Sequence, residues 1–454
     1  MEFDLVIKNG TIVTAEATVQ ADVGIRGERI AAVGEGLSGR RELDAAGKLV
    51  TPGAIDGHVH LEMPIGNFVS ADDFFTGTRA AAFGGTTAIV DFVETAPDET
   101  MLDALAARRA KAEGRAVIDY GLHMTIGPTD ISKLGQLPAV FEAGCGTFKL
   151  YMAYGLRLRD DELLQAFEAI REVGGLPVVH AENWDVICAL VARHRAAGHT
   201  EPRWHPRSRP AVMEAEAAGR VIDLATLAGV PVHIFHVSCP PVVERIAAAR
   251  RRGLPVTGET CPQYLLLDDS VFEQPGVAGA LPVCAPPIRP AGNQDPLWEA
   301  LAANDLQIVT TDHCPFTRED KATGLGDFSR IPGGVPAIEA RFPLLYTFGV
   351  RAGHFSANRW VDIACTTPAR LFGFARKGHI APGYDADLVI FDPQREVTLS
   401  PRTLHEKPDW TPYDGLTVTG WPEVTLSRGE VIVQDGEFLG AAGRGRFVKR
   451  KPVV

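Results

Sequence analysis

The sequence predicts an α/β fold: a (β/α)8 TIM-like barrel with a small β-sandwich domain formed by both chain termini. Through the middle of the chain, short Val/Ile/Leu-rich runs bounded by Gly or Pro alternate with alanine-rich amphipathic stretches. Buried parallel strands joined by crossover helices have this pattern. At both ends, apolar and polar residues alternate in short stretches between turn residues, which indicates hairpins with one buried face.

The hairpin patterns lie in residues 1–51 and 381–454, on either side of the predicted barrel at 52–380. Neither terminal piece is large enough to bury a core alone. We therefore expect the two ends of the chain to meet in one β-sandwich domain.

Eight strand candidates lie in the middle part, near residues 54–58, 86–92, 117–125, 147–151, 176–180, 232–236, 254–258 and 306–311. Amphipathic helices are expected at 98–112, 160–172, 210–228 and 240–252. A doubly wound open sheet is the alternative, but no glycine-rich nucleotide motif follows the first strand. The barrel is favoured, with an active site at the C-terminal ends of its strands.

Composition restricts the class of partner. The 454 residues are 45% hydrophobic and 22% charged, with a formal net charge of -12. This charge, without a Lys/Arg block, argues against nucleic acid or an anionic membrane as the partner. The sequence shows no export signal and no membrane-length apolar run, and its seven scattered cysteines fit a reducing compartment. We expect a cytoplasmic protein with a small-molecule substrate.

Polar residues of metal-binding type follow the predicted strands. They are His58 and His60 after the first strand, Lys149 at the fourth, His180 at the fifth, His236 at the sixth and Asp312 at the eighth. Alternate residues of a strand point the same way, so His58 and His60 can share one metal ion. In a barrel, all these strand ends converge on one mouth.

Each residue taken alone has a simpler explanation. A lone His180 is more often a hydrogen-bonded core histidine, and near His236 and Asp312 stand the competitors His233 and Asp305. Lys149 is the unusual member, because an ammonium group buried beside metal ligands is repelled and loses its proton. A neutral amine can capture carbon dioxide as a carbamate, which turns a repelled cation into a bridging anion.

The sequence resembles the amidohydrolase superfamily, and within it the dihydropyrimidinase and hydantoinase group of cyclic amidases. The resemblance runs along nearly the whole chain, and it rests on motifs in the family's order. They are Gly57-His-Val-His-Leu-Glu-Met-Pro64, Ser70-Ala-Asp-Asp-Phe, Ala82-Phe-Gly-Gly-Thr-Thr87, Phe148-Lys, His180-Ala-Glu-Asn183, His236-Val-Ser238, Thr311-Asp-His-Cys-Pro-Phe316 and Gly443-Arg-Gly-Arg-Phe-Val-Lys.

The resemblance implies two divalent ions, most often Zn2+, and an N6-carboxylated Lys149 between them. One ion is expected on His58, His60 and Asp312, and the other on His180 and His236. A hydroxide bridging the ions would attack a ring amide carbonyl, because metal ions lower the pKa of bound water from about 15.7 towards neutrality. Asp312 would serve as general base and then acid.

The resemblance also implies residues that contact the substrate. The Tyr154 hydroxyl is the expected donor to the oxyanion, with Tyr151 as the competing candidate. In dihydropyrimidinases, the backbone of a serine and of an asparagine holds the ring amide. Here Ala285 and Gly333 stand at the matching positions, so the backbone contacts remain possible in a less polar pocket.

The loop after the histidine pair bears on substrate charge. Dihydroorotases and allantoinases typically carry an arginine two residues after the pair, whereas this chain has Glu62, followed by Met63, Ile65 and Phe68. We interpret this loop as a contact for the apolar substituent of a neutral ring. An equally good interpretation is that these side chains only pack the loop.

The leading function is hydrolysis of a ring C–N bond in a dihydropyrimidine or a 5-substituted hydantoin, giving an N-carbamoyl amino acid. The alternatives are an allantoinase, a dihydroorotase or another amidohydrolase acting on a related cyclic ureide, and a deaminase, which usually lacks the carboxylated lysine. A non-catalytic relative is a third class, but all six ligand positions are intact here. By analogy with the family, we expect a homo-oligomer, a tetramer.

Overall fold

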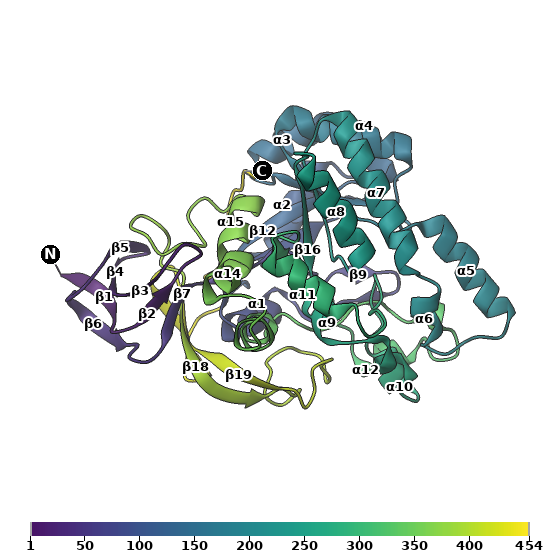
Figure 1. The fold of residues 1–454 in the computed structure, drawn as a ribbon. Coiled ribbons are helices and arrows are strands. Elements are labelled where there is room, and N and C mark those ends of the chain that lie inside the picture. The colour runs from purple at the N-terminus through teal and green to yellow at the C-terminus, as the bar shows by residue number, and fades with distance from the viewer. Residues whose placement is uncertain (1, 453–454) are drawn as a thin grey trace.

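The computed structural model describes residues 2–452 and contains the predicted barrel (Figure 1). Its eight parallel strands follow the order β17-β16-β15-β14-β13-β12-β11-β8. They are β8 (Ala54–Asp56), β11 (Thr86–Val93), β12 (Asp119–Thr125), β13 (Thr147–Tyr151), β14 (Leu176–His180), β15 (Val232–Ile234), β16 (Val256–Thr260) and β17 (Ile308–Val309). A parallel bridge between Val59 and His313 joins the two edge strands just past their ends, so the sheet closes.

Helices between these strands and after the last one cover the barrel. They are α1 (Phe74–Phe83), α2 (Met101–Ala112), α3 (Leu137–Glu142), α4 (Asp160–Val173), α5 (Trp184–Ala196), α7 (Ala211–Ala228), α8 (Pro240–Arg251), α11 (Gln294–Ala302) and α15 (Thr367–Phe372). The four helices expected from the sequence are present, with ends that differ by up to three residues. Local signals set these ends: Thr100 caps α2, and Gly174 and Gly229 end α4 and α7 in the left-handed conformation.

Much of the barrel interior below its mouth is apolar. Alternate residues of the strands, including Ile55, Val90, Val178 and Ile308, form one buried cluster. Phe372 and Phe374, at and just beyond the end of α15, belong to the same cluster. This packing fixes the strand ends from below, which gives the polar residues at the mouth a rigid support.

The two ends of the chain meet, as the sequence predicts. One sheet has the order β21-β20-β19-β18-β7-β2-β3, and a second has the order β5-β4-β1-β6. N-terminal strands are β1 (Phe3–Lys8), β2 (Thr11–Val13), β3 (Thr18–Gln20), β4 (Asp22–Arg26), β5 (Arg29–Gly34), β6 (Gly39–Asp44) and β7 (Leu49–Pro52). C-terminal strands are β18 (Leu388–Thr398), β19 (Thr417–Ser427), β20 (Glu430–Gln434) and β21 (Glu437–Phe438).

Side chains from both ends fill one core. Leu5 and Ile25 from the N-terminal strands pack in the same buried cluster as Leu388 and Val424. Figure 1 shows the yellow-green strands β18 and β19 beside the purple N-terminal strands, at one side of the barrel. The fold class is thus confirmed, while the boundaries at residues 52 and 380 stay a prediction. Among the helices of residues 2–452, none combines the length and apolar character needed to cross a membrane.

Candidate metal centre

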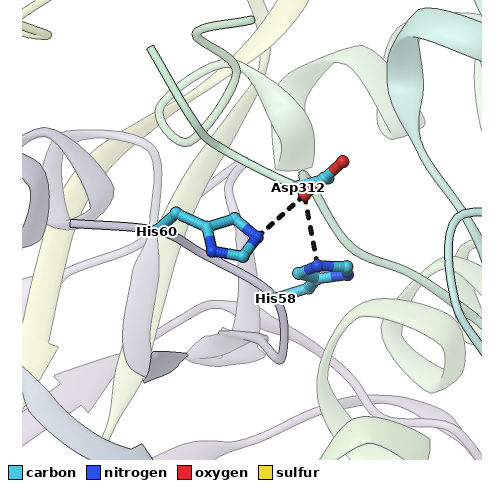
Figure 2. A group of neighbouring side chains, drawn as sticks. All are labelled: His58, His60 and Asp312. Carbon is cyan, nitrogen blue, oxygen red and sulfur yellow. Dashed lines mark hydrogen bonds and ion pairs between the residues drawn. The ribbon is translucent and has the colours of Figure 1, made fainter. Parts of the chain in front are cut away.

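His58 and His60 follow β8 and turn their imidazole rings toward Asp312, which follows β17 (Figure 2). Asp312 Oδ1 lies 3.1 Å from Nε2 of each histidine. The ligand atoms of the three residues all lie within 4.8 Å of one another. The closure of the barrel brings these residues together, although more than 250 positions separate them in the sequence.

The other two predicted histidines continue this group. The ring centroids of His58 and His236 are 5.5 Å apart, and those of His236 and His180 are 4.5 Å apart. Four imidazoles thus form one row across the barrel mouth. Every one of them is at least nine-tenths buried, and Asp312 has 13% of its side chain exposed.

Some polar atoms in this row lack a partner. Nε2 of His58 and Nδ1 of His236 are buried without a hydrogen bond within residues 2–452. Burial also holds the pKa of both imidazoles well below the usual value, so both rings are neutral and keep a free lone pair. A neutral imidazole with a free nitrogen is what a divalent metal ion requires, so these residues fit a metal ion.

Lys149 lies on β13 and is 1% exposed. Its Nζ is 4.2 Å from the ring centroid of Phe235 and 4.6 Å from that of Tyr151. Burial lowers the pKa of the amine to about 7, although the negative charges of Asp312 and Glu259 oppose the shift. A substantial share of neutral amine is therefore present near neutral pH, as carbamate formation requires.

His233, the histidine that competes with His236 as a metal ligand, has hydrogen bonds at both ring nitrogens. His233 bonds through Nδ1 to Thr257 Oγ1 at 2.8 Å and through Nε2 to Glu259 Oε2 at 3.2 Å. Both ring nitrogens are occupied, whereas His236 keeps one free. Asp305 precedes β17, at the opposite end of that strand from Asp312. The geometry favours His236 and Asp312 over these competitors.

The two candidate tyrosines both approach His180. Ring centroid distances to His180 are 5.8 Å for Tyr151 and 5.4 Å for Tyr154. Of the two, Tyr154 lies beside Arg209, whose guanidinium carbon is 5.4 Å from the Tyr154 ring centroid. Burial raises the pKa of the Tyr154 hydroxyl, so it keeps its proton at neutral pH and can donate a hydrogen bond.

Three buried charged residues support the centre and were missed from the sequence. Glu259, at 0% exposure, lies 2.6 Å from Nδ1 of His58. Glu182 lies 2.8 Å from Nε2 of His180, and Arg209 donates to Glu182 at 2.6 Å. Glu259 lies in β16, and Glu182 stands two residues after a strand-end histidine. A carboxylate within a barrel strand or just after its end is the sequence feature from which Glu259 and Glu182 could have been predicted.

Ala285 and Gly333 lie next to each other. A Cβ atom built on Gly333 would be 3.8 Å from Cys284 Cα. Both residues are half-buried between fully buried neighbours. Gly334, the next residue, lies against the carbonyl of Cys314, two residues beyond Asp312. The structure thus places the two predicted backbone contacts together, beside the segment that carries Asp312.

The loop after His60 forms a hairpin of β9 (Pro64–Ile65) and β10 (Phe68–Val69). Met63 Sδ lies 3.3 Å from Nδ1 of His60, so this side chain reaches the centre. Ile65 packs against the barrel cluster. Glu62 behaves differently from its neighbours, because its carboxylate pairs with Arg115 at 2.9 Å. Glu62 therefore supports no inference about substrate charge on its own.

Comparisons with known proteins agree with this geometry. Residues 49–432 match the model of the amidohydrolase family. D-hydantoinases of Streptomyces coelicolor and Geobacillus stearothermophilus are 45% and 47% identical; each alignment covers 98% of this chain, and 97% and 96% of the respective relative. These coverages show that this chain and each of the two relatives are similar along essentially their full lengths.

Solved structures give the same result. D-hydantoinase from a Bacillus sp. AR9 has a TM-score of 0.97 at 48% identity, over 99% of this chain and 100% of that one. Dihydropyrimidinase from Brevibacillus agri has a TM-score of 0.97 at 46% identity, over 99% of each. L-Hydantoinase from Arthrobacter aurescens scores 0.92 at 33% identity, over 99% and 100%. This chain belongs to the amidohydrolase family, within its hydantoinase and dihydropyrimidinase group.

Proposed function

We propose that this protein is a metal-dependent cyclic amidase that opens a dihydropyrimidine or 5-substituted hydantoin ring to an N-carbamoyl amino acid. The observation that carries the proposal is the convergence of His58, His60 and Asp312 at the barrel mouth, with their ligand atoms within 4.8 Å of one another. The relatives named D-hydantoinase and dihydropyrimidinase support the same reaction.

Two divalent ions, most simply Zn2+, would be held by the six residues of the centre. His58, His60 and Asp312 would bind one ion, His180 and His236 the other, and carboxylated Lys149 would bridge them. Imidazole and carboxylate donors suit zinc. The unpartnered nitrogens of His58 and His236 and the pKa of about 7 at Lys149 support this assignment.

Bound ions would supply water with a lowered pKa and polarise the ring carbonyl. Asp312 would accept a proton from the attacking water and return it to the ring nitrogen as the C–N bond breaks. Tyr154 would donate a hydrogen bond from its hydroxyl to the oxyanion. The guanidinium of Arg209, 5.4 Å from the Tyr154 ring centroid, supports a fixed position for this side chain.

The ring itself would bind to the backbone of Ala285 and Gly333, and its substituent would contact Met63 and Ile65 of the hairpin. The substrate is therefore expected to be a small ring with an apolar substituent. Identities of 45% and 47% with two D-hydantoinases, against 33% with an L-hydantoinase, favour the D-enantiomer.

We further propose a cytoplasmic homotetramer. Seven free cysteines, six of them buried, support a reducing compartment. Two apolar side chains of α7, Val212 at 63% and Leu227 at 72% exposure, support contact with another copy. Light scattering of the purified protein tests the assembly.

Turnover of dihydrouracil, D- and L-5-substituted hydantoins, allantoin and dihydroorotate tests the function. We expect ring opening of the first two classes, with the D-hydantoin preferred. Clear preference for dihydroorotate or allantoin would overturn the substrate assignment.

A further inference from the structure

Three carbonyl groups beside Ala285 accept hydrogen bonds from buried side chains. The pairs are Lys321 Nζ to Val283 O at 2.7 Å, His205 Nε2 to Cys284 O at 2.8 Å and Tyr264 Oη to Pro286 O at 2.7 Å. We call the three donors the carbonyl frame. Backbone carbonyls in a loop more often find water or other backbone groups, so three side-chain donors on one short segment need an explanation.

The members of the carbonyl frame come from three separate helices: α12 (Arg318–Ala322), α6 (Trp204–Arg207) and α9 (Pro262–Leu266). Lys321 is 0% exposed, Tyr264 1% and His205 7%. Water therefore cannot readily replace a lost donor, and the carbonyl would be left unsatisfied. Each donor thus fixes the direction in which its carbonyl points.

The effect of this arrangement falls on Ala285. Residues 281–289 are all buried except Ala285, which is half-buried. Because the flanking carbonyls are tied to the protein interior, the N–H and C=O groups of Ala285 itself are left as the open part of the segment. The carbonyl of Val283 also accepts from the backbone N–H of Gly334 at 2.9 Å, which couples the segment to the loop at Gly333.

We propose that Lys321, His205 and Tyr264 are positioning residues that aim the backbone of Ala285, and through Val283 the loop at Gly333, at the substrate ring. This inference rests on the proposed function. The donors touch neither the ring nor the metal ligands, so their loss would weaken ring binding and leave the chemical step and the metal content unchanged.

Tyr264→Phe is the primary variant, because it removes one hydroxyl and keeps the buried ring. Tyr413→Phe is its matched control: Tyr413 is 2% exposed, and its hydroxyl has no partner within residues 2–452. His205→Leu, with His205→Gln as the variant that can still donate, serves if Tyr264→Phe does not fold. KM and kcat for dihydrouracil and a 5-substituted hydantoin, metal content and Tm are measured for each.

We expect Tyr264→Phe to raise KM about tenfold, the effect of one lost hydrogen bond in a binding site, with kcat and bound metal unchanged. Tyr413→Phe should leave KM unchanged, and His205→Gln should recover part of the KM lost in His205→Leu. A lowered Tm with unchanged KM would mean that the frame is only structural, and would overturn the inference alone. A wild-type protein that opens no cyclic amide would overturn the proposed function, and the inference with it.

Discussion

The buried carboxyl group of Glu259 forms a hydrogen bond with Nδ1 of His58 over 2.6 Å. With the proton of this bond on Nδ1, His58 keeps Nε2 free to face Asp312, 3.1 Å away. A neighbouring carboxylate that fixes the tautomer of a ligand histidine also holds the ring in the orientation for binding.

Replacing Glu259 should therefore weaken metal binding. We expect Glu259→Leu to lower metal affinity about 10- to 100-fold, because His58 loses the acceptor that orients it. Glu259→Gln keeps an acceptor oxygen and should lose less. Metal titration of the apoprotein measures both variants, and equal affinities for Glu259→Leu and the wild type would refute the orienting role.

Lys149→Ala should remove the bridge between the proposed ions. We expect loss of most bound metal and of activity, with partial rescue by a short carboxylic acid that takes the place of the carbamate. Elemental analysis of the variant, with and without added acid, measures this effect. Unchanged metal content would contradict the bridging role of Lys149.

Tyr154→Phe tests the oxyanion donor. Removing one such donor typically lowers kcat by about 10²- to 10³-fold, and we expect that loss here with normal metal content. Tyr151→Phe is the matched control, because its ring lies 5.8 Å from His180, against 5.4 Å for Tyr154, whereas Arg209 lies beside Tyr154. A larger loss of kcat in Tyr151→Phe than in Tyr154→Phe would show that Tyr151, and not Tyr154, is the oxyanion donor.

Gly333→Asn and Gly334→Ala should behave in opposite ways. Gly333 has no positive φ, and its nearest neighbour is 3.8 Å from a built Cβ. Gly333→Asn should therefore fold and gain about 0.4–1 kcal/mol of stability. Gly334 has a φ of 146°, and a Cβ there would lie 2.2 Å from Cys314 O, so Gly334→Ala should be destabilised. Denaturant unfolding compares them, and equal effects would contradict the loop geometry.

Lys321 predicts a pH effect on stability. Burial lowers its pKa to about 7 in the folded chain, against about 10.4 in the unfolded chain. Between these values the unfolded state binds more protons, so this group makes stability rise with pH, with its full penalty below the folded pKa. Lys321→Met should lose that rise. Tm measured from about pH 6 to pH 9 checks the slope, and parallel curves would contradict the assignment.

Much of the fold could be predicted because the barrel strands are short apolar runs between clear helix signals. The last strand was the least exact: residues 306–311 were expected, but β17 covers only Ile308–Val309. Past that point the backbone leaves the regular ladder, since Asp312 has a φ of 51°. A hydrophobic run does not reveal where such a turn begins.

The gathering of the four histidines and Asp312 at one mouth could also be predicted, because strand ends in a barrel converge whatever their separation in sequence. The supporting residues could not, because Arg209 and Glu182 meet only after the segment between β14 and α7, which contains α5 and α6, has folded back. Glu62 was misleading for a similar reason: its partner Arg115 is distant in sequence, and no local pattern links the two.

The number of divalent ions per purified chain, measured together with turnover of a D-5-substituted hydantoin and dihydrouracil, tests directly whether the protein is a two-metal cyclic amidase. We expect two ions per chain, and ring opening that is lost when a chelator removes them and returns with Zn2+. Ring opening that persists in metal-free protein, or a fully metallated protein that opens neither ring, would contradict this expectation.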